Sequence, residues 1–469
     1  MTEGIRVYPL ERKLFSAFEK AGFEIYLVGG VVRDRILSRK SRQDDLDFTT
    51  SARPPDTKRI LENLGLRTWD VGAGFGTISA MHTKAGVHRK IEITTFRAEV
   101  YRKRSRKPEV IFGSSLEEDL RRRDFTINAM AADATGALVD PFGGRADISA
   151  GIIRTPMDPV VTMREDPLRM LRAVRFAARY GFALDSGLLA AMEAHAGELD
   201  FVSRERWLME LDEMLDSESG RVAAASVDLL RTTGLLKIVL PELVPLAGEQ
   251  GMPQGPWHHL DAWRHTLTVL EATGRNLDLR WAALLHDAGK PSTRFADLWG
   301  TPHFHGHENA GGEIALAVAE RLKFSKKRRE AVAKLVRLHM KPALYQKSWT
   351  ESALRRLKRD AGPGLDLLLA LARADAAALA PEHREERLRD LDELERRLGE
   401  CRADVRLLPK SLAPALEKAG GIGDLDGPKM GRLLARLEEL VADGELEPGR
   451  KPAYYIDWLE RNPGEIARL

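Results

Sequence analysis

The sequence predicts an α/β region at the N-terminus followed by an all-helical remainder. Over residues 1–150, short runs rich in β-branched and aromatic residues alternate with helical stretches. After about residue 150 these strand signals fade, and Leu, Ala, Arg and Glu recur at the spacing of amphipathic helices. Most of the 12 histidines fall within residues 258–339, which sets one region of the helical part apart from the rest.

Three segments of the N-terminal region are predicted strands. Residues 23–30, FEIYLVGG, form an apolar run that ends in two glycines, as a buried strand followed by a tight turn does. Residues 45–50, DLDFTT, and 90–96, KIEITTF, alternate polar and apolar side chains, which is typical of half-buried strands. We therefore expect a head of mixed strands and helices.

The helical remainder begins with two amphipathic segments. Residues 165–182, EDPLRMLRAVRFAARYGF, are predicted to form a helix that ends near Gly181, and residues 204–215 are predicted to form another. We expect four parts along the chain: a head over 1–150, a helical neck over 151–225, a histidine-rich domain over 226–390 and a helical tail over 391–469.

Composition excludes several classes of protein. The chain has 469 residues, of which 43% are hydrophobic, so it is globular rather than disordered. Its single cysteine, Cys401, excludes an intrachain disulfide. The absence of an 18-residue apolar run and of a signal-peptide core at the N-terminus predicts a cytoplasmic protein. A net charge of +3 identifies no nucleic-acid partner, and the basic clusters at 103–108 and 121–123 indicate one only because candidate catalytic residues lie beside them.

Carboxylates on two of the predicted strands favour metal binding. Asp45 and Asp47 are two residues apart, so on a strand both side chains lie on one face, roughly 6–7 Å apart along the backbone. Such a pair can bind two Mg²⁺ ions for in-line phosphoryl transfer, and Glu92 on the third strand could supply another carboxylate. Two aspartates at this spacing also occur in acidic surface loops, so the spacing is weak evidence by itself.

The glycine turn after the first strand is typical of phosphate binding. Gly29 and Gly30 allow backbone N–H groups to approach phosphates closely, and Arg33 begins the next predicted helix, whose N-terminus favours anions. An ordinary strand-to-helix turn is the alternative reading.

An acidic and a basic residue in the neck have the chemistry of a base reader. Asp166 and Arg169 are three residues apart and would share one face of a helix. Ionised Asp only accepts hydrogen bonds and Arg only donates them, so the pair matches the amino donor and ring-nitrogen acceptor shared by cytosine and adenine. Uracil and guanine would leave polar groups unpaired in a closed pocket. In the alternative, Asp166 caps the helix and forms a surface ion pair of little energetic value.

Histidine and aspartate side chains recur along the histidine-rich domain. They are His265, the adjacent His286 and Asp287, His307, His339 and Asp375. Their spacing resembles that of the HD metal-dependent phosphohydrolases. The resemblance implies a first metal bound by His265, His286, Asp287 and Asp375, with His307 and His339 available for a second. Imidazole with carboxylate suits Ni²⁺, Mn²⁺ or Fe²⁺ better than Mg²⁺ alone, and a metal-bound hydroxide could attack a phosphate ester.

The alternative for any single histidine on an apolar helix is an ordinary core residue. So many histidines in this order make that alternative weak for the set. His258 and His259 fit no ligand position and are interpreted as loop residues.

Five motifs occur in an order that is specific as a set: LVGGVVRD, DLDFTT, IEITTFRAE, EEDLRRRDFTINAMA and EDPLRMLRAVRFAARYGF. Over roughly residues 20–220 the chain resembles the bacterial-type (class II) tRNA nucleotidyltransferases and the related bacterial poly(A) polymerases. The resemblance implies a polymerase-β-like nucleotidyltransferase head. It also implies these roles: Mg²⁺ binding by Asp45 and Asp47, triphosphate binding by Gly29, Gly30 and Arg33, ribose and phosphate binding by Arg123, Asp124 and Asn128, and base selection by Glu165, Asp166 and Arg169.

The resemblance further implies the reaction and its partners. CMP and AMP from CTP and ATP would be added to the 3′ end of tRNA without a template, with contacts to the tRNA acceptor stem. Three alternatives remain: a poly(A) polymerase, an enzyme that adds only CC or only A, and an HD phosphohydrolase with an RNA-binding head. The segment 99–112 resembles one that family members use for the terminal A, although Lys103 replaces the usual acidic residue. Residues 423–450 resemble an RNA-binding tail, and the oligomeric state stays open.

Overall fold

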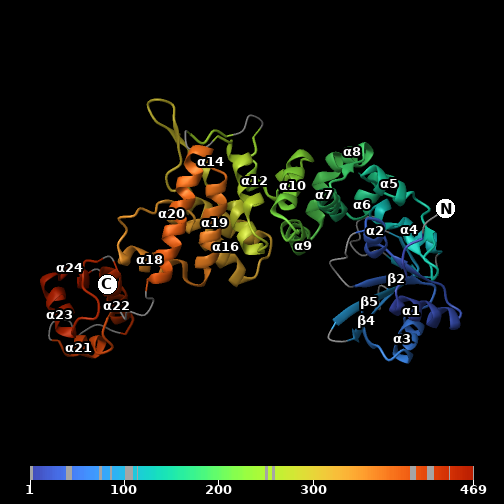
Figure 1. The fold of residues 1–469 in the computed structure, drawn as a ribbon, viewed down its shortest axis with the longest axis horizontal. Helices are drawn as coiled ribbons and strands as arrows, with labels where there is room; N and C mark the ends of the chain where they lie inside the picture. The colour runs from blue at the N-terminus through green and yellow to red at the C-terminus, as the bar shows by residue number, and fades with distance from the viewer. Residues whose placement is uncertain are drawn as a thin grey trace. The chain divides into compact units, whose positions relative to one another are not determined.

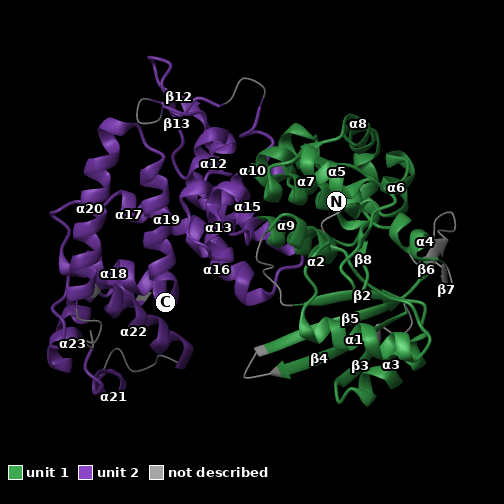
Figure 2. Cartoon of the chain, turned by 45° about the vertical axis from the view of Figure 1, so that its right-hand side comes forward, with its two compact units in different colours: residues 1–214, 225–241 green, residues 215–224, 242–469 purple. Residues whose placement is uncertain are grey.

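The strands of the head pair into one sheet in the computed structural model. The model describes residues 4–38, 45–72, 76–84, 87–100, 109–112, 115–248, 252–255, 259–401, 408–419, 427–442 and 444–467. The chain divides into two compact units, 1–214 with 225–241 and 215–224 with 242–469, which Figure 2 colours separately. Each unit is described by itself below.

The head contains a seven-stranded sheet in the order β3-β4-β5-β2-β1-β8-β9. Its strands are β1 (Ile25–Val28), β2 (Leu46–Thr50), β3 (Arg67–Gly72), β4 (Thr77–Lys84), β5 (Val87–Thr95), β8 (Ala131–Ala132) and β9 (Leu138–Val139). Only β2 and β5 pair in parallel among these neighbours; the other pairs are antiparallel. The three strands predicted from the sequence lie within this sheet, so the predicted α/β head is confirmed.

Helices α1 (Pro9–Lys20) and α3 (Pro54–Asn63) lie over the sheet, as Figure 1 shows. The apolar face of α1 buries Leu14, Phe15 and Phe18, and the ring of Phe15 meets that of Phe48 on β2 edge-on at 5.6 Å. Burial of aromatic rings at this contact fixes the central strand that carries the acidic residues. A second, two-stranded ladder joins β6 (Arg97–Val100) to β7 (Glu109–Phe112). The intervening residues 101–108 lie outside the described part of the chain.

The neck is helical, apart from a short parallel pair, β10 (Ile152–Ile153) with β11 (Ala183–Leu184). Two short elements of the head, α4 (Leu116–Arg121) and η2 (Thr126–Asn128), precede β8. The elements that follow β9 are α5 (Gly144–Ala150), α6 (Pro159–Glu165), α7 (Leu168–Tyr180), α8 (Ser186–His195), η3 (Ala196–Phe201), α9 (Arg204–Leu215), α10 (Gly220–Thr232), α11 (Leu236–Val239) and η4 (Pro241–Leu243). Nearly every residue of α7 is buried except those toward its end, which makes it the central helix of the neck.

One predicted helix boundary is wrong. Residues 165–182 do not form one helix, because α6 ends at Glu165 and α7 begins at Leu168. Between them Asp166 is extended, with φ −141° and ψ 95°. Pro167 explains the break, since its ring disfavours the helical conformation of the preceding residue. The predicted helix over 204–215 coincides with α9.

The second unit is a helical bundle followed by a smaller helical tail. The bundle contains α12 (Ala262–Ala272), α13 (Leu277–Leu285), α14 (Lys290–Thr293), α15 (His307–Arg321), α16 (Lys326–Leu338), α17 (Met340–Ala343), α18 (Glu351–Ala361), η5 (Gly362–Gly364), α19 (Leu365–Ala377) and α20 (Pro381–Glu400). A hairpin of β12 (Phe295–Ala296) and β13 (Pro302–His303) interrupts it. Helix α13 is buried over most of its length, and Trp281 on it packs edge-on against Phe324 at 5.0 Å. No helix of the described residues is long and apolar enough to cross a membrane.

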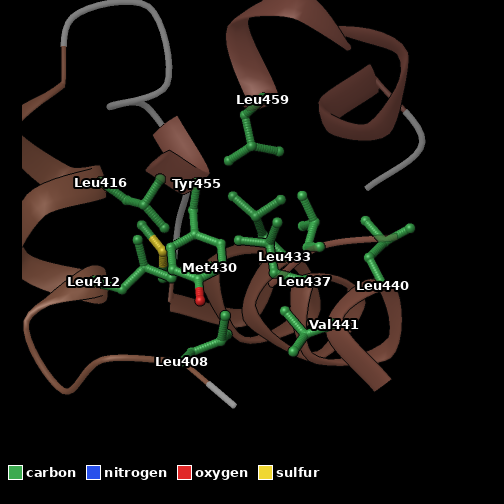
Figure 3. Packing of buried hydrophobic residues seen from close by; sticks show 11 residues of the cluster. Leu408, Leu412, Leu416, Met430, Leu433, Leu437, Leu440, Val441, Tyr455 and Leu459 are labelled. Atoms are coloured by element: carbon green, nitrogen blue, oxygen red, sulfur yellow. The ribbon is translucent and has the colours of Figure 1, made fainter. Parts of the chain in front are cut away.

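The tail has an apolar core of its own. It is formed by α21 (Leu412–Lys418), α22 (Gly427–Ala442), α23 (Pro452–Arg461) and α24 (Gly464–Ala467). Figure 3 shows the leucines of α21 and α22 converging on Tyr455 of α23, whose hydroxyl donates to the Glu447 carbonyl at 2.8 Å. Residues 446–451 lie between α22 and α23. Residues 423–426 and 443 of the segment predicted to bind RNA lie outside the described part of the chain.

Candidate active sites

The acidic residues of the head come together because β2 and β5 are parallel neighbours. In this register Asp47 lies opposite Glu92, and an Asp45 carboxylate oxygen accepts the Lys90 backbone N–H at 3.3 Å. Burial raises the pKa of Asp47, and the carboxylates of Glu92 and Asp45 raise it further, while Arg123 opposes them. Such a group is stabilised as an anion by bound cations, and an all-oxygen donor set fits Mg²⁺.

Glu92 differs from the two aspartates in its surroundings. Its Oε1 accepts a hydrogen bond from the Ser79 hydroxyl at 3.1 Å and lies 2.8 Å from the Lys90 ammonium. Lys90 therefore already neutralises part of the charge of Glu92. Asp45 directly precedes β2, Asp47 lies on β2 and Glu92 lies on the neighbouring β5, where Lys90 already pairs with it.

The glycine turn lies directly beside a basic side chain. Gly29 has a φ of +73°, a conformation that side chains rarely adopt, and a Cβ built there would lie 3.0 Å from Arg123 Nη1. Arg123 also lowers the pKa of Asp47 and contacts Asp119 at 3.4 Å. Its buried Nε atom has no hydrogen-bond partner among the described residues. Arg123 thus presents a free donor between the turn and the carboxylates, where an anionic ligand would satisfy it.

Arg33 is buried rather than open to the turn. Its Nε donates to Asp34 at 2.9 Å, its Nη1 donates to Asn128, and its guanidinium lies 4.8 Å from the centre of the Tyr180 ring. Tyr180 in turn donates its hydroxyl to Asp34 at 3.1 Å. The described contacts therefore fix Arg33 in one orientation beside the glycine turn.

Asp124 and Asn128 form a chain of hydrogen bonds between the head and the neck. Asp124 accepts from Asn128 at 2.9 Å and from Arg172 on α7 at 2.6 Å. Arg172 also reaches Glu210 on α9 at 3.3 Å, and Glu210 accepts from Arg175 at 2.7 Å. Burial works against the charge of Asp124, but Arg172 and Asn128 together lower its pKa to about 2. Both carboxylate oxygens of Asp124 are thus engaged within the protein.

Replacing Asp124 with Ala is expected to lower the free energy of unfolding of its unit by about 3–5 kcal/mol, because Arg172 would keep a buried, uncompensated charge. The depressed pKa of about 2 sets the sign of the pH dependence. The contribution of Asp124 is complete above its ordinary pKa of about 3.9 and is lost as the pH falls toward 2. Urea unfolding at several pH values would measure both effects. Asp228→Ala, which removes an exposed ion pair with Arg231, is the matched control and should cost below about 1 kcal/mol. Equal losses in the two variants would contradict the structural role of Asp124.

The neck residues expected to select the base are arranged differently from a simple Asp–Arg pair. Asp166 accepts from Arg206 of α9 at 2.9 Å and from the Leu168 backbone at 3.3 Å, as a helix cap does. Arg169 donates to the Arg122 carbonyl at 2.7 Å.

Two further acceptors hold the Arg169 guanidinium. They are the Thr162 carbonyl and the Glu165 carboxylate, each at 3.3 Å. Arg169 is therefore fixed by groups from α6 and from the end of α4, while Asp166 is paired with Arg206. Only the fold shows the pairing of Arg206 with Asp166, 40 residues away in the sequence.

In the second unit the predicted ligands form two triads of close side chains. One consists of His265, His286 and Asp375, and the other of Asp287, His307 and His339, with the ligand atoms of each within 4.8 Å of one another. His265 Nε2 lies 3.0 Å from Asp375 and 3.3 Å from His286 Nε2. Asp287 contacts both sets, at 3.2 Å from His286 Nε2 and 3.5 Å from His307 Nε2. His259 is exposed, and His258 lies outside the described residues.

The orientation of the imidazoles is that of metal ligands. His286, His307 and His339 each place Nδ1 at 2.7–2.8 Å from the carbonyl oxygen three residues earlier. Because a carbonyl only accepts, each Nδ1 carries the proton and each Nε2 can bind a metal. Burial lowers the pKa of His339 to about 3, and burial lowers that of His307, so both rings are neutral near pH 7.

Two neutral acceptors therefore face each other at 3.2 Å, the distance between Nε2 of His307 and Nε2 of His339. Without a proton between them, these lone pairs repel, and a bound divalent cation would remove the repulsion. The residues present thus fit a metal. Lys290 forms a buried ion pair with Asp287 at 2.7 Å and donates to Gln254 at 2.5 Å, so it holds the carboxylate in place.

Three family models match successive parts of the chain. They are the poly(A) polymerase head domain over residues 25–154, a probable RNA- and SrmB-binding site of polymerase A over 181–246, and the HD domain over 262–396.

Curated relatives and solved structures extend these matches. The chain is 38% identical to the multifunctional CCA protein of Halorhodospira halophila over 332 residues, which cover 68% of this chain and 74% of that protein. It is 36% identical to the A-adding tRNA nucleotidyltransferase of Deinococcus radiodurans over 364 residues, 75% of this chain and 81% of that protein. The structure of the Bacillus stearothermophilus CCA-adding enzyme in complex with CTP is 26% identical, with a TM-score of 0.65 over 99% of this chain and 100% of that one. The Thermotoga maritima CCA-adding enzyme complexed with tRNA shares the fold, with 18% identity and a TM-score of 0.54 over 97% of this chain and 96% of that one.

Proposed function

Because the chain belongs to the bacterial-type (class II) family of CCA-adding tRNA nucleotidyltransferases with an HD domain, we propose that it completes the 3′ end of tRNA. It transfers CMP and AMP from CTP and ATP to the terminal hydroxyl without a nucleic-acid template and releases pyrophosphate. The observation that carries this proposal is the convergence of Asp45, Asp47 and Glu92 on two parallel strands beside the glycine turn.

Each head residue has a distinct task in the proposed reaction. Asp45 and Asp47, with Glu92 beside them, hold Mg²⁺, which when bound neutralises triphosphate charge and makes the 3′-hydroxyl a better nucleophile. Gly29 leaves room for the phosphates, and the Nε of Arg123, which has no hydrogen-bond partner among the described residues, donates to them.

Arg33, Asp124 and Asn128 act one step further from the nucleotide. Asn128 accepts from Arg33 and donates to Asp124, so the three side chains fix one another beside the turn. We assign them the positioning of the nucleotide site through this chain of hydrogen bonds.

A direct assay tests the reaction and its subclass. Incubation of tRNA that lacks its 3′ end with each NTP separately, followed by sequencing of the product ends, is expected to show C addition from CTP and A addition from ATP. Curated relatives include both CCA-adding and A-adding enzymes, so addition of A alone to tRNA ending in CC would assign the narrower subclass. A long run of A on unrelated RNA would favour a poly(A) polymerase. The segment 99–112 proposed for terminal A addition lies mostly outside the described residues.

Base choice is proposed to depend on Asp166 and Arg169, with Glu165 orienting the arginine. The three acceptors around Arg169 preorganise its guanidinium, so little conformational entropy is lost when it donates to a base. Asp166 can accept from a base amino group beside, or in place of, Arg206. Cytosine and adenine offer this amino group next to a ring-nitrogen acceptor.

The Arg169→Ala variant is expected to lose discrimination against UTP and GTP by about tenfold to a hundredfold, because one donor to the base is missing. Single-nucleotide incorporation with each of the four NTPs, reported as kcat/KM ratios, measures this. Arg164→Ala is the control: Arg164 precedes the same helix break but is exposed and contacts Glu198. An equal loss with all four NTPs would show that Arg169 is structural only.

For the HD domain we propose a second, hydrolytic activity on phosphate esters. The two triads of imidazoles and carboxylates favour a divalent transition metal such as Ni²⁺, Mn²⁺ or Fe²⁺ over Mg²⁺. Such a metal, when bound, supplies a hydroxide at neutral pH. His265, His286, Asp287 and Asp375 would hold the first ion, with His307 and His339 available to a second. RNA ends with 2′,3′-cyclic phosphates or phosphomonoesters are the substrate class.

A further inference from the structure

The hairpin that interrupts the HD bundle presents aromatic rings on its surface. Strands β12 and β13 pair Phe295 with His303, and the turn between them is closed by Asp297, which accepts from the backbones of Trp299 at 2.9 Å and Thr301 at 2.8 Å. Gly300 has a φ of +82°, which the turn requires. These local bonds define the hairpin without any buried apolar side chain of its own, and Figure 2 shows it projecting from the end of the bundle.

The rings of Phe295, His303 and His305 lie close together at this hairpin. The centre of the Phe295 ring lies 5.2 Å from that of His303, with planes 24° apart, and 5.4 Å from that of His305, with planes 36° apart. The rings of His303 and His305 are 5.9 Å apart and 15° from parallel. Phe295 is 46% exposed, so its ring does not contribute to the packing of the core. Solvent-accessible aromatic rings gathered in this way can serve as a surface on which nucleobases stack.

The three rings connect directly to the proposed metal site. His305 stands two residues before His307, and the Phe304 carbonyl between them accepts from His307 Nδ1 at 2.8 Å. The Lys290 ammonium lies 5.6 Å from the centre of the Phe304 ring and 2.7 Å from Asp287. Phe304, which directly follows β13, therefore contacts one proposed metal ligand and the lysine that pairs with another.

We propose that Phe295, His303 and His305 form a stacking platform for the nucleobase at the 3′ end of an RNA strand whose terminal phosphate enters the HD site. This proposal rests on the proposed hydrolytic function of that site. A nucleobase matches a small cluster of rings next to phosphate chemistry, whereas a docked protein would require an apolar surface that continues beyond them. The exposed Leu298 and Trp299 are confined to the turn.

The first test separates the base from the phosphate. Short RNA strands that end in a 2′,3′-cyclic phosphate would be compared with and without a base on the terminal nucleotide. Phe295→Ala is expected to raise KM for the base-bearing strand by about tenfold with kcat unchanged, because stacking holds the substrate equally before and during the reaction. The abasic strand should show no difference. Phe295→Leu, which keeps an apolar side chain but no ring, should resemble Phe295→Ala.

Leu298→Ala is the matched control, since Leu298 is 97% exposed in the same hairpin and has no ring. It should leave both KM values unchanged. If the wild-type protein hydrolyses both strands with equal KM, or if Phe295→Ala changes both strands alike, the platform is refuted.

A binding measurement distinguishes failure of the platform from failure of the hydrolase. A four-nucleotide RNA with 2-aminopurine and a 3′-phosphate at its end should lose fluorescence when the base stacks on wild-type protein, and Phe295→Ala should retain most of that fluorescence. This readout needs no turnover, so quenching without hydrolysis would refute the hydrolytic function and keep the platform. Equal quenching in wild type and variant overturns the platform. A change of oligomeric state on size-exclusion chromatography of Phe295→Ala would also overturn it, in favour of a protein-docking role.

Discussion

Replacement of Asp47 by Asn is expected to reduce nucleotide addition by about 10³-fold or more, because the loss of one metal-binding carboxylate removes several kcal/mol of transition-state stabilisation. Asp47 stands opposite Glu92 and on the same strand face as Asp45, so no other side chain of β2 could replace it. Steady-state addition of a single C to tRNA lacking its 3′ end measures the effect, and a filter-binding assay with the same tRNA should show unchanged affinity.

A stability measurement would distinguish a loss of catalysis in Asp47→Asn from a loss of folding. The pKa of Asp47 is raised, chiefly by burial, so its charge opposes folding in metal-free protein. For a raised carboxyl pKa, stability relative to the neutral side chain decreases as the pH rises through the ordinary range toward the folded value. Asp47→Asn should therefore melt at the same or a higher temperature than wild type at neutral pH with EDTA present.

The matched control is Asp70→Asn, which removes an exposed carboxylate paired with Lys58 on the same sheet. It should change neither addition nor melting temperature. Near-normal incorporation by Asp47→Asn would refute the assignment of the catalytic carboxylates, and a lower melting temperature would show that Asp47 supports the fold instead.

The division into an α/β head and a helical remainder was predictable because it depends on local periodicity. The strand that begins at Leu46 and the glycine turn at Gly29 follow from residues within each segment. The order of strands in the sheet did not follow, since the parallel pairing of β2 with β5 joins residues 45 positions apart. That pairing, rather than the DxD spacing alone, places Glu92 opposite Asp47.

Long-range hydrogen bonds explain why the sequence did not predict the partners of several head and neck side chains. Arg33 and Asn128 are 95 residues apart, and Asp124 and Arg172 are 48 apart, so no local pattern shows that these side chains bind one another. The helix break at Asp166 was predictable in principle from Pro167. Its partner Arg206 was not, because the ion pair forms only when α9 packs beside α7.

The histidines of the HD domain were easier to predict as metal ligands than the neck residues were as base readers, because the orientation of each imidazole is set by nearby residues. Each of His286, His307 and His339 donates to the carbonyl three residues before it, at or beside the end of a helix. The spacing along the chain thus fixes the direction of Nε2 before the helices assemble. The assembly then adds what the sequence did not show, the two triads that share Asp287 as a neighbour.

Replacement of both His286 and Asp287 by Ala is expected to abolish metal-dependent hydrolysis of 2′,3′-cyclic phosphates and phosphomonoesters, by about 10³-fold or more, because each triad loses a ligand. Nucleotide addition should persist, since the carboxylates of the head lie in the other unit. Hydrolysis with Ni²⁺, Mn²⁺ and Fe²⁺ in turn, together with the metal content of the purified protein, measures the effect. Both readouts should fall in parallel.

Single substitutions guard against a loss of folding in the double variant. His339→Ala removes one ligand of the second triad and leaves His286 and Asp287 in place, so it should reduce metal content partially and hydrolysis with it. His259→Ala removes an exposed histidine without a ligand role and should change neither. Unchanged helical content by circular dichroism in every variant would show that the second unit remains folded. Wild-type protein that hydrolyses none of these substrates with any of the metals would refute the hydrolytic role, and full metal content in the double variant would refute the ligand assignment, because the remaining His265, Asp375, His307 and His339 would then suffice to bind the ions.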